Sequence, residues 1–81
     1  MMEQKIKQDA IHIGERIRRL RRARHIGQTE LAMRMQLRNV PMTREALVKI
    51  ERGTQHIKTS QLKAIKEILN ITYEELFDGE D

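Results

Sequence analysis

The residue types that could carry catalysis or bind a metal are few in this chain and lie far apart. His12, His25 and His56 form no H-x-x-x-H or H-E-x-x-H pair that could hold a metal on one helix. A nucleophilic mechanism needs a hydroxyl, amine or thiol beside a base, and the only serine, Ser60, falls at an expected helix start where capping explains it. The four glycines do not cluster into a phosphate-binding loop. We therefore expect no enzyme activity, no metal site and no cofactor.

Charge is the strongest chemical signal, and it divides along the chain. Residues 1–66 contain all 16 lysines and arginines and six acids, a net charge of +10. Residues 67–81 contain the other six acids and no base, a net charge of −6. Ten excess positive charges on so small a body attract a polyanion such as nucleic acid. A solvated basic face that only aids solubility explains the same composition, so charge alone leaves both interpretations open.

Length and composition limit the class of protein further. The 81 residues suffice for one small core but not for a separate catalytic domain. The absence of cysteine excludes disulfides and favours a reducing, cytoplasmic location. Neither secretion nor membrane insertion is expected, because Met1–Asp9 has no apolar signal segment and no stretch approaches about 18 apolar residues.

Apolar spacing predicts five helices and no strand, in one domain over residues 10–77. The expected helices cover residues 10–24, 28–36, 44–52, about 59–69, and a short final helix through Phe77. Local signals support their ends: Thr43 is an expected N-cap, Asn39 an expected left-handed residue and Gly53 an expected C-terminal glycine, while Thr72 and Glu75 form a capping box. Residues 1–9 are expected to be a partly frayed N-terminal extension, and residues 78–81 an acidic tail.

The second and third helices are short and joined by a brief turn, which suggests a helix-turn-helix. The outward positions of the third helix are Arg44, Glu45, Val48, Lys49 and Arg52. A helix that enters the major groove needs long donors for guanine edges and a small apolar group for a thymine methyl. A generic amphipathic helix with a polar exposed face has the same pattern, so the face alone does not decide between the two.

Three segments carry a more specific combined pattern. They are I-G-E-R-I-R-R-L-R-R-A-R-H-I-G-Q-T-E-L-A at 13–32, A-L-V-K-I-E-R-G at 46–53 and L-N-I-T-Y-E-E-L-F at 69–77. Together they resemble the Cro/repressor-type, or Xre-family, DNA-binding domain. The resemblance implies an all-α, compact five-helix bundle of the phage-repressor type, with the helix-turn-helix formed by helices 2 and 3.

The resemblance also implies roles for individual residues. Arg21 matches the arginine that pairs with the glutamate of I-E-R-G, here Glu51, and Gln28 matches a position that touches the DNA backbone. The residues expected to read bases are Arg44, Glu45, Val48 and Lys49. The expected backbone contacts are Gln28, Arg38, Asn39, Thr43, Arg52, Thr54, Gln55, His56 and Lys58. Glu45 either accepts from a cytosine amine or repels phosphate and sharpens orientation; both remain open.

The chain departs from the family pattern at two places. Gly27 stands where the second helix usually has a serine or threonine cap, and a glycine caps less specifically. The turn Q-L-R-N-V-P-M is longer than in the compact form of the family and resembles a branch with a lengthened turn. The longer turn leaves the docking angle of the third helix open and brings Arg38 and Asn39 into consideration as phosphate contacts.

We expect a sequence-specific duplex-DNA-binding transcriptional regulator, a repressor, that acts as a homodimer through the major groove. Either Tyr73, Leu76 and Phe77 supply an apolar dimer patch, or Leu76 and Phe77 close the core of the monomer. One alternative is a protein-interaction module, such as an antitoxin-like partner-binding protein whose acidic end binds a basic partner. Another is a non-specific nucleoid-type binder, which fits the charge but leaves the ordered turn unexplained.

Overall fold

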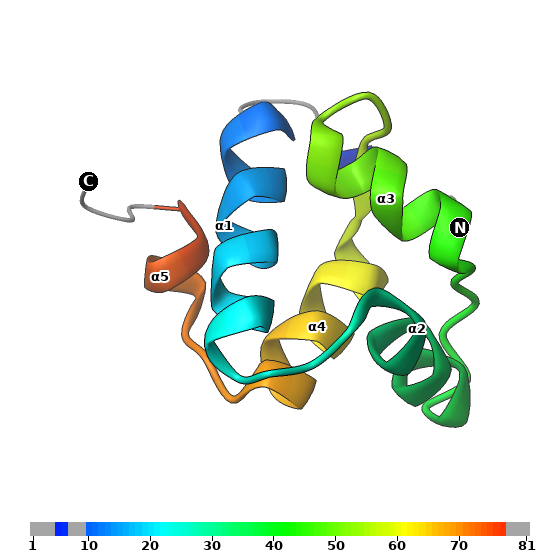
Figure 1. The fold of residues 1–81 in the computed structure, drawn as a ribbon. Coiled ribbons are helices and arrows are strands. Elements are labelled where there is room, and N and C mark those ends of the chain that lie inside the picture. The colour runs from blue at the N-terminus through cyan, green and yellow to red at the C-terminus, as the bar shows by residue number, and fades with distance from the viewer. Residues whose placement is uncertain (1–4, 7–9, 78–81) are drawn as a thin grey trace.

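A computed structural model describes residues 5–6 and 10–77, and it contains five helices and two very short strands (Figure 1). In chain order the elements are β1 (Lys5–Ile6), α1 (Ala10–Ala23), α2 (Gln28–Leu37), α3 (Arg44–Arg52), β2 (Ile57–Lys58), α4 (Thr59–Leu69) and α5 (Tyr73–Phe77). The sequence-based helix boundaries agree with these to within a residue. The all-α class is confirmed.

The strands β1 and β2 are an addition that the sequence pattern did not indicate. They pair in antiparallel fashion, with Lys5 opposite Lys58 and Ile6 opposite Ile57. Two residues are too few to show an alternating pattern, so no strand was expected there. The pair attaches part of the 1–9 segment to the body of the protein. The rest of that segment and the acidic tail at 78–81 lie outside the described residues.

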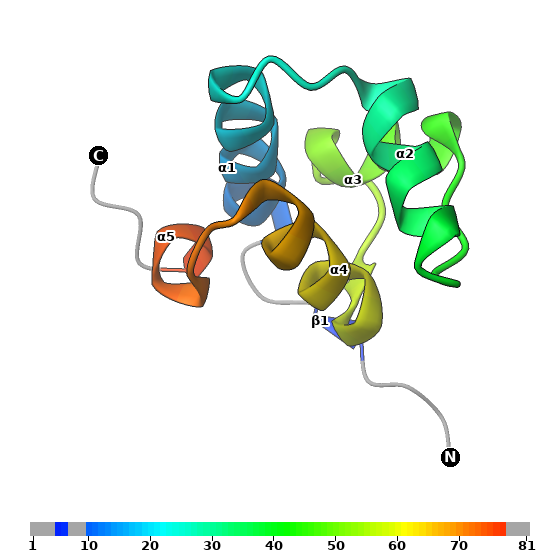
Figure 2. The same cartoon turned by 90° about the horizontal axis from the view of Figure 1, so that it is seen from below.

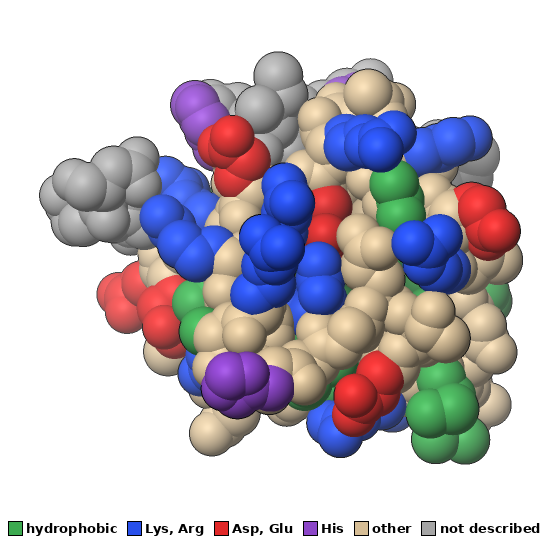
Figure 3. Space-filling view, viewed as in Figure 1, with side chains coloured by type: hydrophobic (Ala, Val, Ile, Leu, Met, Phe, Trp, Pro, Cys, Tyr) green, Lys and Arg blue, Asp and Glu red, His purple; other side chains and the backbone are tan. Residues whose placement is uncertain are grey.

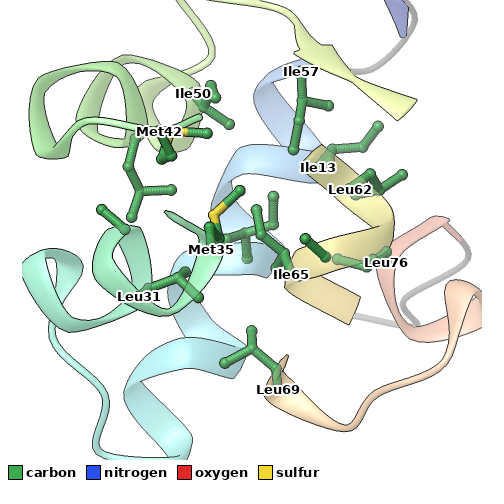
Figure 4. Packing of buried hydrophobic residues seen from close by; sticks show 14 of the residues in the cluster. Ile13, Leu31, Met35, Met42, Ile50, Ile57, Leu62, Ile65, Leu69 and Leu76 are labelled. Carbon is green, nitrogen blue, oxygen red and sulfur yellow. The ribbon is translucent and has the colours of Figure 1, made fainter. Parts of the chain in front are cut away.

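One apolar core joins all five helices, and it determines which faces remain outside. The buried side chains come from α1 (Ile13, Ile17), α2 (Leu31, Met35), α3 (Leu47, Ile50), α4 (Leu62, Ile65, Leu69) and α5 (Leu76). Figure 4 shows how they converge between the helices. α5 packs against α1 on the side of the molecule away from α2 (Figures 1 and 2). Within the described part of the chain, no helix is both long and apolar enough to cross a bilayer.

α1 and the C-terminal half of α3 approach each other closely at Gly14. A Cβ atom built on Gly14 would overlap the carbonyl oxygen of Ile50 and come 2.7 Å from that of Glu51. In the sequence, Gly14 only weakens the helical pattern. The structure gives the reason for its presence, because no side chain fits at this crossing.

The long turn between α2 and α3 is held by several specific contacts. Asn39 takes the left-handed conformation, with φ 63°, and the Val40 N–H donates to the carbonyl of Met35 at 3.0 Å. The Gln36 side-chain amide donates to the carbonyl of Met42, whose own side chain is buried in the core. The lengthened turn is therefore anchored at both ends, and α3 is fixed relative to α2.

Thr43 is the N-cap of α3, with its Oγ1 accepting a hydrogen bond from the Ala46 N–H at 3.0 Å. Thr43→Ala is expected to lower the free energy of unfolding by about 1 kcal/mol, because one N–H of the first turn loses its acceptor. Urea denaturation followed by circular dichroism measures this. Thr43→Ser keeps the acceptor and should behave like the wild type. Thr29→Ala removes an exposed hydroxyl that has no hydrogen bond within the described residues, and an equal loss there would contradict the cap.

Candidate nucleic-acid interface

The outward face of α3 carries the side chains that the sequence assigned to base reading. Arg44, Glu45 and Lys49 are exposed and Val48 is half-buried, whereas Leu47 on the opposite face is fully buried. Helical spacing causes this division, because the residues that fill the core recur at steps of three and four. Among the described residues, neither the Arg44 nor the Lys49 side chain has a hydrogen-bond or ion-pair partner. Their donors are free to meet a ligand.

Between α1 and α3 the surface is hollowed, with a volume of about 590 Å³. The cations around this hollow are Arg18, Arg21 and Arg22 of α1 and Arg44 and Arg52 of α3. Gln28 borders it from the start of α2, and Glu15, Val48 and Glu51 complete the lining. Figure 3 shows lysine and arginine side chains gathered on this face, over α1 and α3. Five arginines against two glutamates give the hollow an excess of positive charge.

The floor of the hollow is a buried ion pair between α1 and α3. Arg21 Nε lies 2.8 Å from Glu51 Oε2, and Arg21 Nη2 lies 2.9 Å from Oε1, so the pair is bidentate. Arg21 Nη1 also donates to the carbonyl of Ile26 at 2.9 Å. Only 8% and 3% of the two side chains are exposed. This pair is the one that the family resemblance implied, and it fixes the C-terminal end of α3 against α1.

Gln28 joins the same network, which the sequence did not indicate. Its Nε2 donates to Glu51 Oε1 at 3.0 Å, although these residues are 23 positions apart. A single carboxylate thus orients one side chain from α1 and another from the first position of α2. No spacing rule within one helix could have revealed this contact.

The N-terminus of α2 lies beside this network, because Gln28 is its first residue. Its cap, Gly27, is extended, with φ −77° and ψ 166°, and contributes no side-chain acceptor. The first N–H groups of a helix have no partner within the helix and carry a partial positive charge, which suits them to bind an anion. Because no side chain caps them, the first N–H groups of α2 have no side-chain acceptor at the edge of the hollow that Gln28 borders.

The structure does not bring all of the expected backbone contacts together. Arg38 lies at the C-terminal end of α2, about 15 Å along the helix from Gln28. Its Nη1 is 2.6 Å from Glu67 Oε1 on α4, an exposed pair, and Asn39 follows it in the exposed turn. Neither residue borders the hollow. A DNA strand in the hollow and one at Arg38 would have to be different stretches of backbone.

The segment 54–58 follows α3, and its side chains have mixed environments. The Thr54 hydroxyl donates to the Lys49 carbonyl at 3.2 Å, whereas His56 and Lys58 are exposed and Gln55 is half-buried. The sequence pattern predicts no strand here, but the last two residues of the segment form β2. The strand pairing gives the end of this segment a fixed backbone.

Arg18 and Arg22 are the candidate contacts that the sequence reasoning missed. Both are exposed on α1 and both border the hollow. Their spacing of four residues was a usable signal, because it places them on one side of a helix together with Arg21. Their proximity to α3, however, depends on the packing of the two helices.

The last helix resolves the two interpretations of its apolar residues. Leu76 is fully buried and closes the core, whereas Tyr73 and Phe77 remain 43% and 44% exposed, with ring centroids 6.4 Å apart. Arg16 of α1 donates to the carbonyls of Leu76 and Phe77 at 3.0 and 2.8 Å. α5 is therefore tied to α1, with two aromatic rings facing outward.

Comparisons with known proteins agree with this architecture. A family model described as a helix-turn-helix domain matches residues 14–81. The restriction-modification controller protein C.AhdI from Aeromonas hydrophila is similar in structure, with a TM-score of 0.74 and 28% sequence identity over 85% of this chain and 97% of that one. The SHP pheromone receptor Rgg2 from Streptococcus dysgalactiae is similar over 85% of this chain, with a TM-score of 0.68 and 26% identity, but only 24% of the receptor is covered.

Among curated proteins, none matches this chain significantly. The family and the fold are those of DNA-binding regulators, and they point to a binding protein rather than an enzyme. On these grounds the chain belongs to the helix-turn-helix domain family, and its fold is the Cro/repressor type that its motifs indicated.

Proposed function

We propose that this chain is a sequence-specific, duplex-DNA-binding transcriptional regulator that reads the major groove with α3 and represses transcription by occupying its site. The observation that carries the proposal is the outward face of α3, where the side chains of Arg44 and Lys49 are exposed and have no partner within the described residues. Arginine and lysine are the side chains best suited to the O6 and N7 acceptors of guanine. The similarity to a restriction-modification controller protein supports a regulatory role.

Phosphate contacts would supply most of the affinity, and they would make it fall as salt rises. The N-terminus of α2 supports such a contact, because its first N–H groups have no side-chain cap and lie beside Gln28. Arg52 extends the positive face along α3, and the exposed side chains of His56 and Lys58 follow beyond the helix. These contacts would position the protein on the duplex without reading its sequence.

We further propose that the regulator acts as a homodimer. The exposed rings of Tyr73 and Phe77 form a small apolar surface on α5 that the monomer does not bury. Two copies joined there would read a site with two-fold symmetry, with half-sites about one helical turn, or roughly 34 Å, apart.

The test begins with selection of bound duplexes from a random pool, followed by titration of the selected duplex over a salt series. Arg44→Ala and Lys49→Ala are each expected to weaken binding to the selected duplex by about 5- to 150-fold, the effect of about 1–3 kcal/mol per base contact. Binding to a random duplex should weaken much less. Lys63→Ala is the matched control, because it removes an exposed cation of α4 that does not border the hollow. Selected sites with two symmetric half-sites would support the homodimer.

Two outcomes favour the other functions. Equal affinity for selected and random duplexes would contradict base reading and favour a non-specific binder. A second candidate function, a protein-interaction module, is favoured by the Tyr73–Phe77 pair beside the exposed carboxylates of Glu74 and Glu75. A partner that stays bound after nuclease treatment, together with no preference for any duplex, would support that function instead.

A further inference from the structure

We infer that Arg18 and Arg22 of α1 bind the phosphate backbone of DNA across the hollow between α1 and α3. The inference rests on the proposed function, because it assumes that the chain binds duplex DNA. It adds a contact from a helix outside the helix-turn-helix. In this arrangement the strand lies between α1 on one side and α3 on the other.

The first argument is the difference between the arginines that have partners and those that do not. Several arginines are engaged in contacts that the structure shows: Arg16 with the carbonyls of α5, Arg21 with Glu51, Arg24 with the Asn70 carbonyl, Arg34 with Glu30, and Arg38 with Glu67. Arg18, Arg22, Arg44 and Arg52 have no such partner among the described residues, and all four border the hollow. Each guanidinium therefore keeps its five donors available on one face of the molecule.

The second argument is that the nearby carboxylates do not neutralise these cations. Glu51 already accepts two hydrogen bonds from Arg21 and one from Gln28, so its oxygens are committed to the floor of the hollow. Glu15 is exposed and forms no ion pair within the described residues. Like charges held close together in this way favour a polyanion that can be shared among them.

The third argument is the length of the positive surface, which favours a DNA strand over a small anion. Arg44 and Arg52 are eight positions apart on α3, about 12 Å along the helix axis, and Arg18 and Arg22 are about 6 Å apart on α1. Phosphates recur about every 3.4 Å of axis along one DNA strand, so a stretch of this length spans several of them. The N-terminus of α2, which has no side-chain cap, borders the same hollow through Gln28.

The experiment compares Arg18→Gln, Arg22→Gln and the double variant with Lys63→Gln, an exposed cation that does not border the hollow. Each change in the hollow is expected to reduce the slope of log affinity against log salt by about 1, and the double variant by about 2. Because phosphate contacts carry no sequence information, the affinities for selected and random duplexes should fall by the same factor. Lys63→Gln should leave the slope unchanged.

A second measurement locates the contact on the DNA. Duplexes that carry a neutral methylphosphonate at one backbone position at a time should reveal one or two positions where neutralisation weakens the wild type but not the double variant. Identical maps and identical slopes for the two proteins would overturn the inference, even if the wild type still prefers its selected duplex. A wild type that shows no such preference overturns the proposed function instead, and the slopes then still decide whether α1 touches the backbone.

A titration with inorganic pyrophosphate distinguishes a hollow that binds the DNA backbone from one that binds a small free phosphate compound. We expect no saturable binding in the micromolar range, measured by the shift in melting temperature in the absence of DNA. Saturable binding that Arg22→Gln abolishes would overturn the inference and assign the hollow to a small free anion. The variants themselves should fold normally, because neither side chain is buried or hydrogen-bonded within the described residues.

Discussion

Glu51→Ala is expected to lower the free energy of unfolding by about 3–5 kcal/mol, enough to abolish a large part of the stability of a domain this size. The change leaves the Arg21 guanidinium buried opposite no negative charge, and it also removes the acceptor of the Gln28 amide. The stability is lost because the buried Arg21 guanidinium has no counter-charge and the N–H groups that it donated to Glu51 lack acceptors, and not only because its attraction to the Glu51 carboxylate is gone. Urea denaturation of the wild type and the variant measures the difference.

A matched control uses the exposed ion pair of α2. Glu30→Ala removes the acid that pairs with Arg34 one helical turn away, where both side chains are at least 40% exposed. Solvent screens such a pair, so its loss should cost at most about 0.5 kcal/mol. The double variant Arg21→Met, Glu51→Leu should lose less stability than Glu51→Ala, because it leaves no buried charge without a partner. A double variant that is less stable than the single variant would contradict this explanation.

Gly14→Ala is expected to destabilise the protein by about 1–3 kcal/mol or more, in spite of the better helix propensity of alanine. Alanine in a helix interior gains up to about 1 kcal/mol over glycine, but the new methyl group would press on the carbonyls of Ile50 and Glu51. Those oxygens belong to the backbone of α3, so the contact can be relieved only if the two helices separate. Separation would also widen the hollow and change the spacing of the arginines that border it.

Gly27→Ala provides the comparison, because a Cβ atom at Gly27 meets nothing within 4 Å and the residue has an ordinary negative φ. We expect a change of no more than about 1 kcal/mol there, caused by the poorer capping of α2 by alanine. Thermal and urea denaturation of both variants gives the two values. A Gly14→Ala protein that is more stable than the wild type would show that helix propensity outweighs the crossing.

The helices and their ends could be predicted because their signals are local. The Thr43 cap is confirmed by its hydrogen bond to the Ala46 N–H, and the left-handed conformations expected at Asn39 and Gly53 are both present. The Thr72–Glu75 capping box at α5 also forms, with the Glu75 carboxylate accepting from the Thr72 N–H at 2.9 Å. Each of these features depends on residues within one turn of chain.

The features that could not be predicted depend on residues brought together by folding. The β1–β2 pair joins segments about fifty positions apart, and neither strand alone has a detectable pattern. The contacts of Gln28 with Glu51 and of Arg38 with Glu67 likewise join residues far apart in the sequence, which no local pattern indicates. The sequence indicated the outward face of α3 because amphipathic spacing determines it. That Arg18 and Arg22 have no carboxylate partner among the described residues can be found only from the folded arrangement of those residues.

The attachment of α5 through Arg16 has a mechanical consequence. The Arg16 guanidinium donates hydrogen bonds to the last two carbonyls of α5. Gly14 and Arg21 of the same helix, α1, contact α3. α1 thus lies between α5, which carries the aromatic rings, on one side and α3, which borders the hollow, on another. If a second copy bound to those rings, a helix rather than a flexible segment would set the distance between the α3 helices of the two copies. The DNA site would then tolerate little change in the spacing between its two halves.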